Sequence, residues 1–341
     1  MEQLRFGLIG CGRVAPRHAE SFAALPDARL VAVADVRESR AAYFAQQYGV
    51  DLYTDYHALL ARPDVDVVSI CTPSGLHAQM TVDALQAGKH VVVEKPIALS
   101  LADADRMIAA AAAARRKLCV VLQNRYNPPM QDLRRIVDEG RLGRLLLGNA
   151  TVRWYRPQEY YEDEWHGTWA MDGGALMNQS IHHIDALQWF MGRPESVFAF
   201  TGTLAHRMEA EDTGVAVIRF AGGTLGSVEG STITYPENLE GSVALFGELG
   251  SAKVGGTALN RKAVWKVAGE LEREREILTR DQVDPPSIYG TSHQKVIADM
   301  IEAIRDDRAP KTHGAEGRKS LALVLAIYES ARTGQPVMFR D

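Results

Sequence analysis

The chain has 341 residues, of which 46% are hydrophobic and 24% are charged, and its formal net charge is −5. This composition excludes a disordered chain, and the length favours two domains with a cleft between them. The acidic balance argues against a nucleic-acid binder, because such binding depends mainly on phosphate neutralisation by Lys and Arg.

Membrane, export and metal signals are weak throughout. No apolar run reaches the roughly 20 residues that a membrane-spanning helix needs. The first strand is expected to begin near Leu4, so we expect a cytoplasmic protein without a leader. The three cysteines form no Cys-x-x-Cys pair and lie in apolar surroundings, which indicates reduced core residues. We expect no metal site.

The first predicted strand, residues 4–10, leads into Gly10-Cys11-Gly12-Arg13-Val14-Ala15 and a helix over residues 16–25. This is the Gly-x-Gly-x-x-Gly/Ala pattern of dinucleotide-binding turns. Gly10 allows the tight turn, Gly12 lets the backbone approach a pyrophosphate, and Ala15 permits close packing of the helix on the strand. The pyrophosphate is expected at the helix N-terminus, where free amides favour an anion.

A second buried strand, residues 29–34, ends in Asp35, which lies 23 residues after Gly12. An acid at this spacing accepts hydrogen bonds from the ribose hydroxyls of NAD and repels the extra phosphate of NADP. Arg37 and Arg40 leave NADP open, since arginines just past this position can neutralise that phosphate. Asp35 is otherwise an ordinary turn residue at the end of a strand.

Strands and helices then alternate up to residue 122, which predicts a doubly wound parallel sheet. Thr72 and Pro73 follow one strand, and Glu94 and Lys95 follow the next. Ligands bind at the carboxyl ends of such strands. Lys95 can there hydrogen-bond a substrate hydroxyl and stabilise negative charge on its oxygen. The alternative is a surface lysine neutralised by Glu94.

Residues 171–185 contain a second candidate catalytic residue. Gly173 and Gly174 predict a turn, followed by a helix up to residue 190. On a helix, Asn178, His182 and Asp185 share one face. His182 is our candidate for proton transfer, because imidazole titrates near neutral pH. The alternative is a buried structural pair of His182 with an aspartate.

Several segments, taken together and in this order, resemble the glucose-fructose oxidoreductase, inositol dehydrogenase and MocA (Gfo/Idh/MocA) family. They are the Gly10-Cys11-Gly12 turn, Cys71-Thr72-Pro73 with Leu76-His77, Ala87-Gly88-Lys89-His90-Val91, Glu94-Lys95-Pro96, and Gly173-Gly174 to His182 and Asp185. The resemblance covers essentially the whole chain. It implies an N-terminal Rossmann domain, residues 1–123, and a C-terminal α+β domain with an open, mostly antiparallel sheet, residues 124–341.

The resemblance also implies an NAD-dependent oxidoreductase whose catalytic lysine and histidine are Lys95 and His182. Most members carry aspartate four residues before the histidine, where this chain has Asn178. An amide cannot relay a proton, so we expect Asn178 to orient substrate or cofactor. The expected cofactor-binding residues are Gly10, Gly12, Arg13, Val14, Asp35, Thr72, Pro73, His77, Glu94, Lys95 and Gln123.

Candidate substrate ligands follow in the second domain. Arg153 and Arg156 lie within a segment rich in aromatic residues, and arginines bind carboxylates or phosphates while rings bind sugar or base faces. These side chains equally suit a small core and a solvated surface. Arg125, Asn178, Tyr289 and His293 complete the expected substrate set, although Tyr289 and His293 also suit ordinary helix capping.

Within the family, these substrate segments look most like dehydrogenases that oxidise the 3-hydroxyl of UDP-N-acetylglucosaminuronate in bacterial surface-polysaccharide synthesis. An inositol, polyol or other sugar dehydrogenase is the alternative, and a non-catalytic NAD-binding regulator is a third possibility that Asn178 leaves open. The exposed face of the second sheet needs covering, so we expect a homo-oligomer formed through it.

Overall fold

The computed structural model describes residues 3–256, 258–280 and 292–339. The chain forms two compact units, Met1–Gln123 with Thr291–Arg318, and Asn124–Gly290 with Lys319–Asp341. The division at residue 123 coincides with the expected boundary. Residues 291–318 differ from the prediction, because they pack with the first unit. No helix in the described part of the chain is long and apolar enough to cross a membrane.

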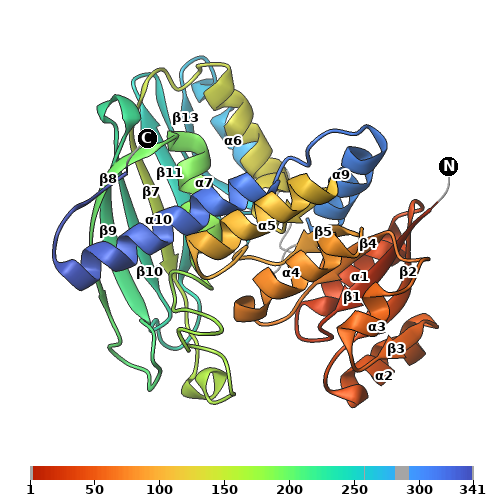
Figure 1. Cartoon of the computed structure of the whole chain (residues 1–341). Helices are drawn as coiled ribbons and strands as arrows, with labels where there is room; N and C mark the ends of the chain where they lie inside the picture. Colours follow the sequence, from red (N-terminus) through yellow and green to blue (C-terminus); the bar gives the residue numbers. More distant parts are fainter. Residues whose placement is uncertain (1–2, 257, 281–291, 340–341) are drawn as a thin grey trace. The chain divides into compact units, whose positions relative to one another are not determined.

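The first unit is built on a six-stranded parallel sheet in the order β3-β2-β1-β4-β5-β6 (Figure 1). Its strands are β1 Leu4–Ile9, β2 Ala28–Ala34, β3 Asp51–Tyr53, β4 Val67–Ile70, β5 His90–Val93 and β6 Leu118–Val120. All four residues of β4 are buried, as expected for a strand covered on both faces. The predicted doubly wound sheet is confirmed.

The helices of this unit are α1 Ala15–Ala24, α2 Glu38–Tyr48, α3 Tyr56–Leu60, η1 Ser74–Leu76, α4 His77–Gln86, α5 Leu101–Ala114 and α9 His293–Arg305. The strand order reverses between β1 and β4, so right-handed crossovers place α1 and α4 on opposite faces of the sheet. Helix α9 packs beside α1 (Figure 1). This packing explains why the segment that begins α9 belongs to the first unit although it follows the second in sequence.

The second unit contains an eight-stranded sheet in the order β13-β12-β11-β7-β10-β9-β8-β14 (Figure 1). Its strands are β7 Leu145–Arg153, β8 Pro194–Gly202, β9 Thr213–Phe220, β10 Leu225–Ser231, β11 Glu240–Gly247, β12 Gly250–Gly255, β13 Arg261–Val267 and β14 Val337–Met338. Only β7 and β10 pair in parallel, and the other neighbours are antiparallel. The predicted open, mostly antiparallel sheet is confirmed.

The helices of this unit are η2 Gln123–Tyr126, α6 Pro128–Asp138, η3 Gln158–Tyr161, α7 Ile181–Met191, η4 Ala221–Gly223, η5 Leu271–Arg273 and α8 Glu274–Thr279. Helix α10, Gly314–Thr333, begins in the first unit and continues into the second. Helix α7 packs on β7 and β11. A side chain at Gly148 of β7 would lie 2.8 Å from Leu187 and Met191, so glycine there lets α7 approach the sheet closely.

Candidate active site

The glycine-rich turn between β1 and α1 has the geometry that a dinucleotide needs. Gly10 has a φ of +90°, and a Cβ there would lie 2.8 Å from the backbone carbonyl of Cys71. A Cβ at Gly12, in contrast, would meet no atom within 4 Å. The first glycine therefore closes the turn against β4, while the second leaves open space beside the helix N-terminus, where a pyrophosphate fits.

Asp35 is held at the end of β2 by two backbone amides. Its Oδ2 accepts a hydrogen bond from Cys11 N and its Oδ1 accepts one from Arg37 N, both at 2.8 Å. The carboxylate is thus fixed next to the glycine-rich turn. Each oxygen keeps a second lone pair, so the group fits the role of accepting ribose hydroxyls.

Thr72 and His77 lie at the carboxyl end of β4. The Thr72 hydroxyl is buried and has no hydrogen-bond partner among the described residues, which suits a donor reserved for a ligand. His77 is buried, and its two ring nitrogens contact the carbonyl oxygens of Pro96 and Thr72 at 2.8 and 3.0 Å. We therefore interpret His77 as a residue that holds the loops at Thr72 and Pro96 together.

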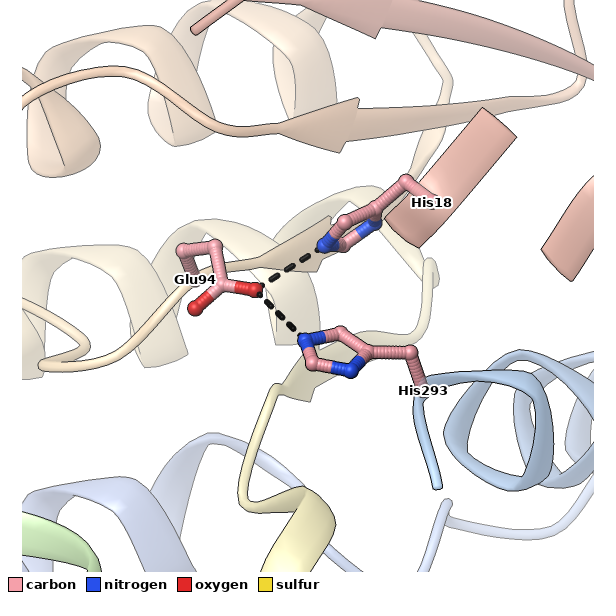
Figure 2. A group of neighbouring side chains, drawn as sticks. All are labelled: His18, Glu94 and His293. Atoms are coloured by element: carbon pink, nitrogen blue, oxygen red, sulfur yellow. Dashed lines mark hydrogen bonds and ion pairs between the residues drawn. The ribbon is translucent and has the colours of Figure 1, made fainter. Parts of the chain in front are cut away.

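Lys95 follows β5, as predicted, and is partly buried. The preceding Glu94 is buried, and its carboxylate faces two histidines of the same unit, His18 and His293 (Figure 2). The sequence predicts Glu94 as a cofactor ligand and His293 as a substrate ligand. The carboxylate lies 2.9 Å from the His18 ring and 3.5 Å from the His293 ring, and the two ligand roles stay predictions.

The segment that precedes His182 is not helical, in contrast to the prediction. Helix α7 begins at Ile181, and residues 175–179 form turns. The backbone amides of Ala175 and Leu176 donate to the carbonyl oxygen and to Oε1 of Glu211, at 2.9 and 2.8 Å. These long-range bonds fix the start of the segment, while the amides of Asn178 and Gln179 donate to the carbonyl oxygens of Gly174 and Ala175.

The expected polar stripe of Asn178, His182 and Asp185 therefore does not form as one helix face. The Asn178 amide nitrogen donates to Oδ1 of Asp172. Asp185 forms a buried ion pair with Arg125, with N–O distances of 2.7 and 2.8 Å. His182 lies in the first turn of α7 and is 8% exposed.

The sequence predicts Arg125 as a substrate ligand, but the structure gives it a different partner. Its guanidinium binds both carboxylate oxygens of Asp185, and Ser320 also hydrogen-bonds that carboxylate. Removing one member of such a buried pair typically costs about 3–5 kcal/mol, since the other charge is left unpaired. We therefore interpret Arg125 as an anchor for α7 and exclude it from the proposed substrate site.

Arg153 and Arg156 are predicted as a pair, but the structure separates them. Arg153 lies on the outer face of the sheet, because the neighbouring Val152 is buried on the face that α7 covers. Its guanidinium forms ion pairs with Glu229 and Glu240, at 2.6 and 3.0 Å. Arg153 therefore does not point toward α7 and His182 of its own subunit.

Arg156 follows the end of β7 and lies over aromatic rings. Its guanidinium carbon is 5.3 Å from the Trp154 ring and 5.5 Å from the Tyr160 ring. Tyr160 contacts Gln179, which adjoins Asn178, through a 3.4 Å hydrogen bond. Within the described residues, no carboxylate lies within ion-pair distance of Arg156. This arginine is thus linked to the Asn178 segment and retains its charge for an anion.

Comparison with known proteins gives the family. A profile described as "Oxidoreductase family, NAD-binding Rossmann fold" matches residues 4–122, and the "GFO/IDH/MocA C-terminal domain" matches residues 130–253. The chain belongs to the Gfo/Idh/MocA oxidoreductase family. It is an NAD-dependent dehydrogenase of a sugar or polyol hydroxyl, and its cofactor is NAD.

Two solved structures of this family resemble the whole chain. The WlbA dehydrogenase from Bordetella pertussis, in complex with NADH and UDP-GlcNAcA, is 40% identical, with a TM-score of 0.94 and coverage of 100% of this chain and 99% of that one. The WlbA dehydrogenase from Chromobacterium violaceum, with the same two ligands, is 38% identical, with a TM-score of 0.91 and coverage of 100% and 97%. The myo-inositol 2-dehydrogenase of Thermotoga maritima is 28% identical over 99% of both chains.

Three residues that shape the site in this Gfo/Idh/MocA member escape prediction from the sequence. His18, Asp172 and Glu211 contact Glu94, Asn178 and Leu176 respectively. Only Asp172 carries a local signal, since it directly precedes the Gly173-Gly174 turn. The predicted ligand Tyr289 lies outside the described residues.

Proposed function

We propose that this chain oxidises the 3-hydroxyl of UDP-N-acetylglucosaminuronate (UDP-GlcNAcA) to a ketone, as a step in bacterial surface-polysaccharide synthesis. The main support is the 38–40% identity, over essentially the whole length, to two dehydrogenases whose structures contain NADH and UDP-GlcNAcA. Identity to the inositol dehydrogenase from Thermotoga maritima is 28%. The placement of Arg156 agrees with an anionic substrate, because its charge has no carboxylate partner among the described side chains.

In the proposed reaction, the His182 imidazole removes the proton of the substrate hydroxyl. Lys95 hydrogen-bonds the same oxygen and stabilises the negative charge that develops on it. Asn178, fixed by Asp172, orients the sugar by hydrogen bonding, since an amide cannot accept the proton. Bound NAD supplies the chemistry of accepting a hydride from the carbon that carries the hydroxyl.

The cofactor is assigned to residues of the first unit. The open space at Gly12 suits the pyrophosphate, the fixed Asp35 carboxylate suits the ribose, and the Thr72 hydroxyl is available at the end of β4. Gly10, Arg13, Val14, Pro73 and Gln123 stay predictions for this role. Lys95 and His182 belong to different units, and their convergence on one substrate is part of the proposal.

An inositol or polyol dehydrogenase is the second candidate, supported by the full-length similarity to the Thermotoga enzyme. An uncharged polyol needs no arginine, so the two candidates differ in what they require of Arg156. The activity test is NADH formation by the purified protein with NAD and one of three substrates: UDP-GlcNAcA, its analogue UDP-N-acetylglucosamine, which lacks the sugar carboxylate, or myo-inositol. The proposal predicts the highest kcat/KM for UDP-GlcNAcA. Preference for myo-inositol would replace the proposal, and no turnover with any of them would favour a non-catalytic NAD-binding regulator.

We also propose that the chain forms a homo-oligomer through the outer face of the eight-stranded sheet. Phe200 and Val215 are cross-strand partners there and are 68% and 50% exposed. Leu225, Leu147 and Phe246 form a second row across β10, β7 and β11 and are 51%, 39% and 37% exposed. A second copy of the sheet would cover these apolar rows.

A further inference from the structure

Three buried side chains of the first unit meet next to Lys95. His18 comes from the first turn of α1, Glu94 directly follows β5, and His293 begins α9 (Figure 2). They are 0%, 7% and 3% exposed. Burying a carboxylate is costly unless it is hydrogen-bonded, so such a cluster calls for an explanation.

The Glu94 carboxylate uses both of its oxygens. Oε1 lies 2.9 Å from Nε2 of His18 and 3.5 Å from Nε2 of His293. Oε2 accepts a hydrogen bond from the backbone N–H of Lys95 at 3.2 Å. The cluster therefore contacts the main chain of the residue proposed to bind the substrate oxygen.

His18 is itself held from its other side. Its Nδ1 lies 2.7 Å from the hydroxyl of Ser69 in β4. A neutral imidazole satisfies both contacts when Nε2–H donates to Glu94 and Nδ1 accepts the Ser69 proton. Burial would raise the pKa of the Glu94 carboxyl, but the hydrogen bond from His18 and the nearby His293 ring hold it well below its usual value. The group is thus an anion at neutral pH.

The three side chains are also the one group of possible metal ligands found in the described ranges. The contact between His18 and Glu94 fits a hydrogen bond better than two ligands of one metal ion. Two ligand atoms of a tetrahedral zinc site, with bonds of about 2.0–2.1 Å, lie about 3.3 Å apart. The His18 and Glu94 atoms are 2.9 Å apart, which is the ordinary length of an N–H···O hydrogen bond.

We propose that His18 and His293 are positioning residues that act through Glu94 to fix Lys95. The inference rests on the proposed role of Lys95 in the reaction. His18 lies on the helix whose N-terminus is assigned to the NAD pyrophosphate, so the cluster ties the cofactor-binding helix to the Lys95 turn. His293 brings α9 into the same contact. Helix α9 follows the second unit in sequence but belongs to the first, and the proposal gives it a role in aligning Lys95.

The first test compares Glu94→Gln, His293→Ala and His293→Gln with the wild-type holoenzyme. A glutamine at Glu94 keeps the size but cannot accept both the His18 and Lys95 protons. We expect kcat to fall by roughly tenfold to a hundredfold, because misplacing a catalytic group by about 1 Å has this effect. NADH affinity, measured by fluorescence titration, should stay near the wild-type value. His293→Gln retains a donor and should recover part of the kcat lost in His293→Ala.

His90→Gln is the matched control, since His90 lies at the opposite end of β5 and its ring accepts a hydrogen bond from the Lys117 amide. We expect it to leave kcat unchanged. Thermal unfolding of every variant separates stability from positioning. Variants at Glu94 and His293 that lose thermal stability but keep the wild-type kcat would overturn the inference and leave a purely structural cluster.

A readout that needs no substrate keeps the inference separate from the proposed function. The proton shared by His18 and Glu94 should give a downfield imidazole N–H resonance in the NADH complex, which Glu94→Gln removes. Crystals of that variant with NADH should show the Lys95 main chain displaced. An undisplaced Lys95 would contradict the cluster's role even if UDP-GlcNAcA proves to be a substrate. Full activity of Lys95→Met would instead contradict the proposed function.

Tight zinc binding by the wild-type protein at this cluster, lost in His18→Asn, would show that the three side chains form a metal site and would overturn the hydrogen-bonded assignment.

Discussion

The side-chain amide of Asn178 donates a hydrogen bond to the carboxylate of Asp172, which in turn accepts one from the Gly167 amide. The carboxylate of this segment thus lies at position 172, while position 178 carries a donor. An aspartate at position 178 would face a second carboxylate here. An amide at position 178 therefore avoids this repulsion and keeps the hydrogen bond to Asp172.

Replacing Asn178 by aspartate is expected to destabilise the protein by about 1–3 kcal/mol at pH 8, because a hydrogen bond is lost and like charges meet. Repulsion raises the pKa of the carboxylate pair in the folded state above its unfolded value. Stability is then present at low pH and is lost as pH rises through the raised pKa. Urea unfolding at pH 5 and pH 8 measures this. Asn178→Ala, which adds no charge, should lack the recovery at pH 5; equal pH profiles for the two variants would argue against the repulsion.

Glu211 provides a second pH-dependent prediction. Its carboxyl accepts from Leu176 N and Tyr328 Oη, but Oε2 has no partner among the residues that the structure describes. Burial raises the pKa of Glu211 to about 7. The folded state therefore binds this proton more tightly than the unfolded state, so the stability that Glu211 contributes is present at low pH and is lost as pH rises toward 7.

Glu211→Gln should remove this dependence. Between pH 4.5 and 7 the wild-type free energy of unfolding should fall, relative to the variant, by about 3 kcal/mol. Denaturant titrations at pH 5 and pH 8 for both proteins give the difference. A variant whose stability declines with pH as steeply as the wild type would show that Glu211 does not hold a proton.

Arg156 and Arg153 allow a matched comparison of two arginines three residues apart. Arg156→Met should raise KM for UDP-GlcNAcA by roughly tenfold to a hundredfold, because a charge-assisted contact with an anion is lost, while NADH affinity is unchanged. Arg153→Met should leave KM near the wild-type value, since its charge is neutralised on the outer face. Equal effects of the two substitutions would remove Arg156 from the proposed substrate site.

The outer face of the sheet predicts a change in assembly. A glutamate in place of Phe200 puts a charge into the apolar row, so we expect the oligomer to dissociate to subunits of 37.5 kDa. Size-exclusion chromatography with light scattering gives the mass. Tyr43→Glu, at an exposed site on α2 of the other unit, serves as the control. A wild-type protein that is already monomeric would contradict the proposed oligomer.

Much of the first unit is predictable from the sequence because its signals are local. The apolar run 4–10, the glycines at 10 and 12 and the acid at 35 each act within a few residues, and the structure confirms the parallel sheet that they predict. The start of α7 is different. Residues 175–180 contain good helix formers, yet the amides of Ala175 and Leu176 bond to Glu211, which lies more than thirty residues later in the chain, and α7 begins only at Ile181.

The candidate site shows the same limit. Arg125, Arg153 and Arg156 look alike in the sequence, and only their partners separate an anchor, a surface ion pair and a candidate anion ligand. The contact between Glu94 and His293 joins residues almost two hundred positions apart. No pattern in the sequence marks such a pair, because burial and tertiary packing determine it.

In the proposed reaction, His182 takes the substrate proton while NAD is held by the first unit. Single-turnover NADH formation by wild type and His182→Ala, alongside NADH titration of both, tests this most directly. We expect the rate with UDP-GlcNAcA to fall by at least about a hundredfold in His182→Ala, because a general base is lost. NADH affinity should be retained. A His182→Ala protein that binds NADH and still forms product at the wild-type rate would contradict the claim.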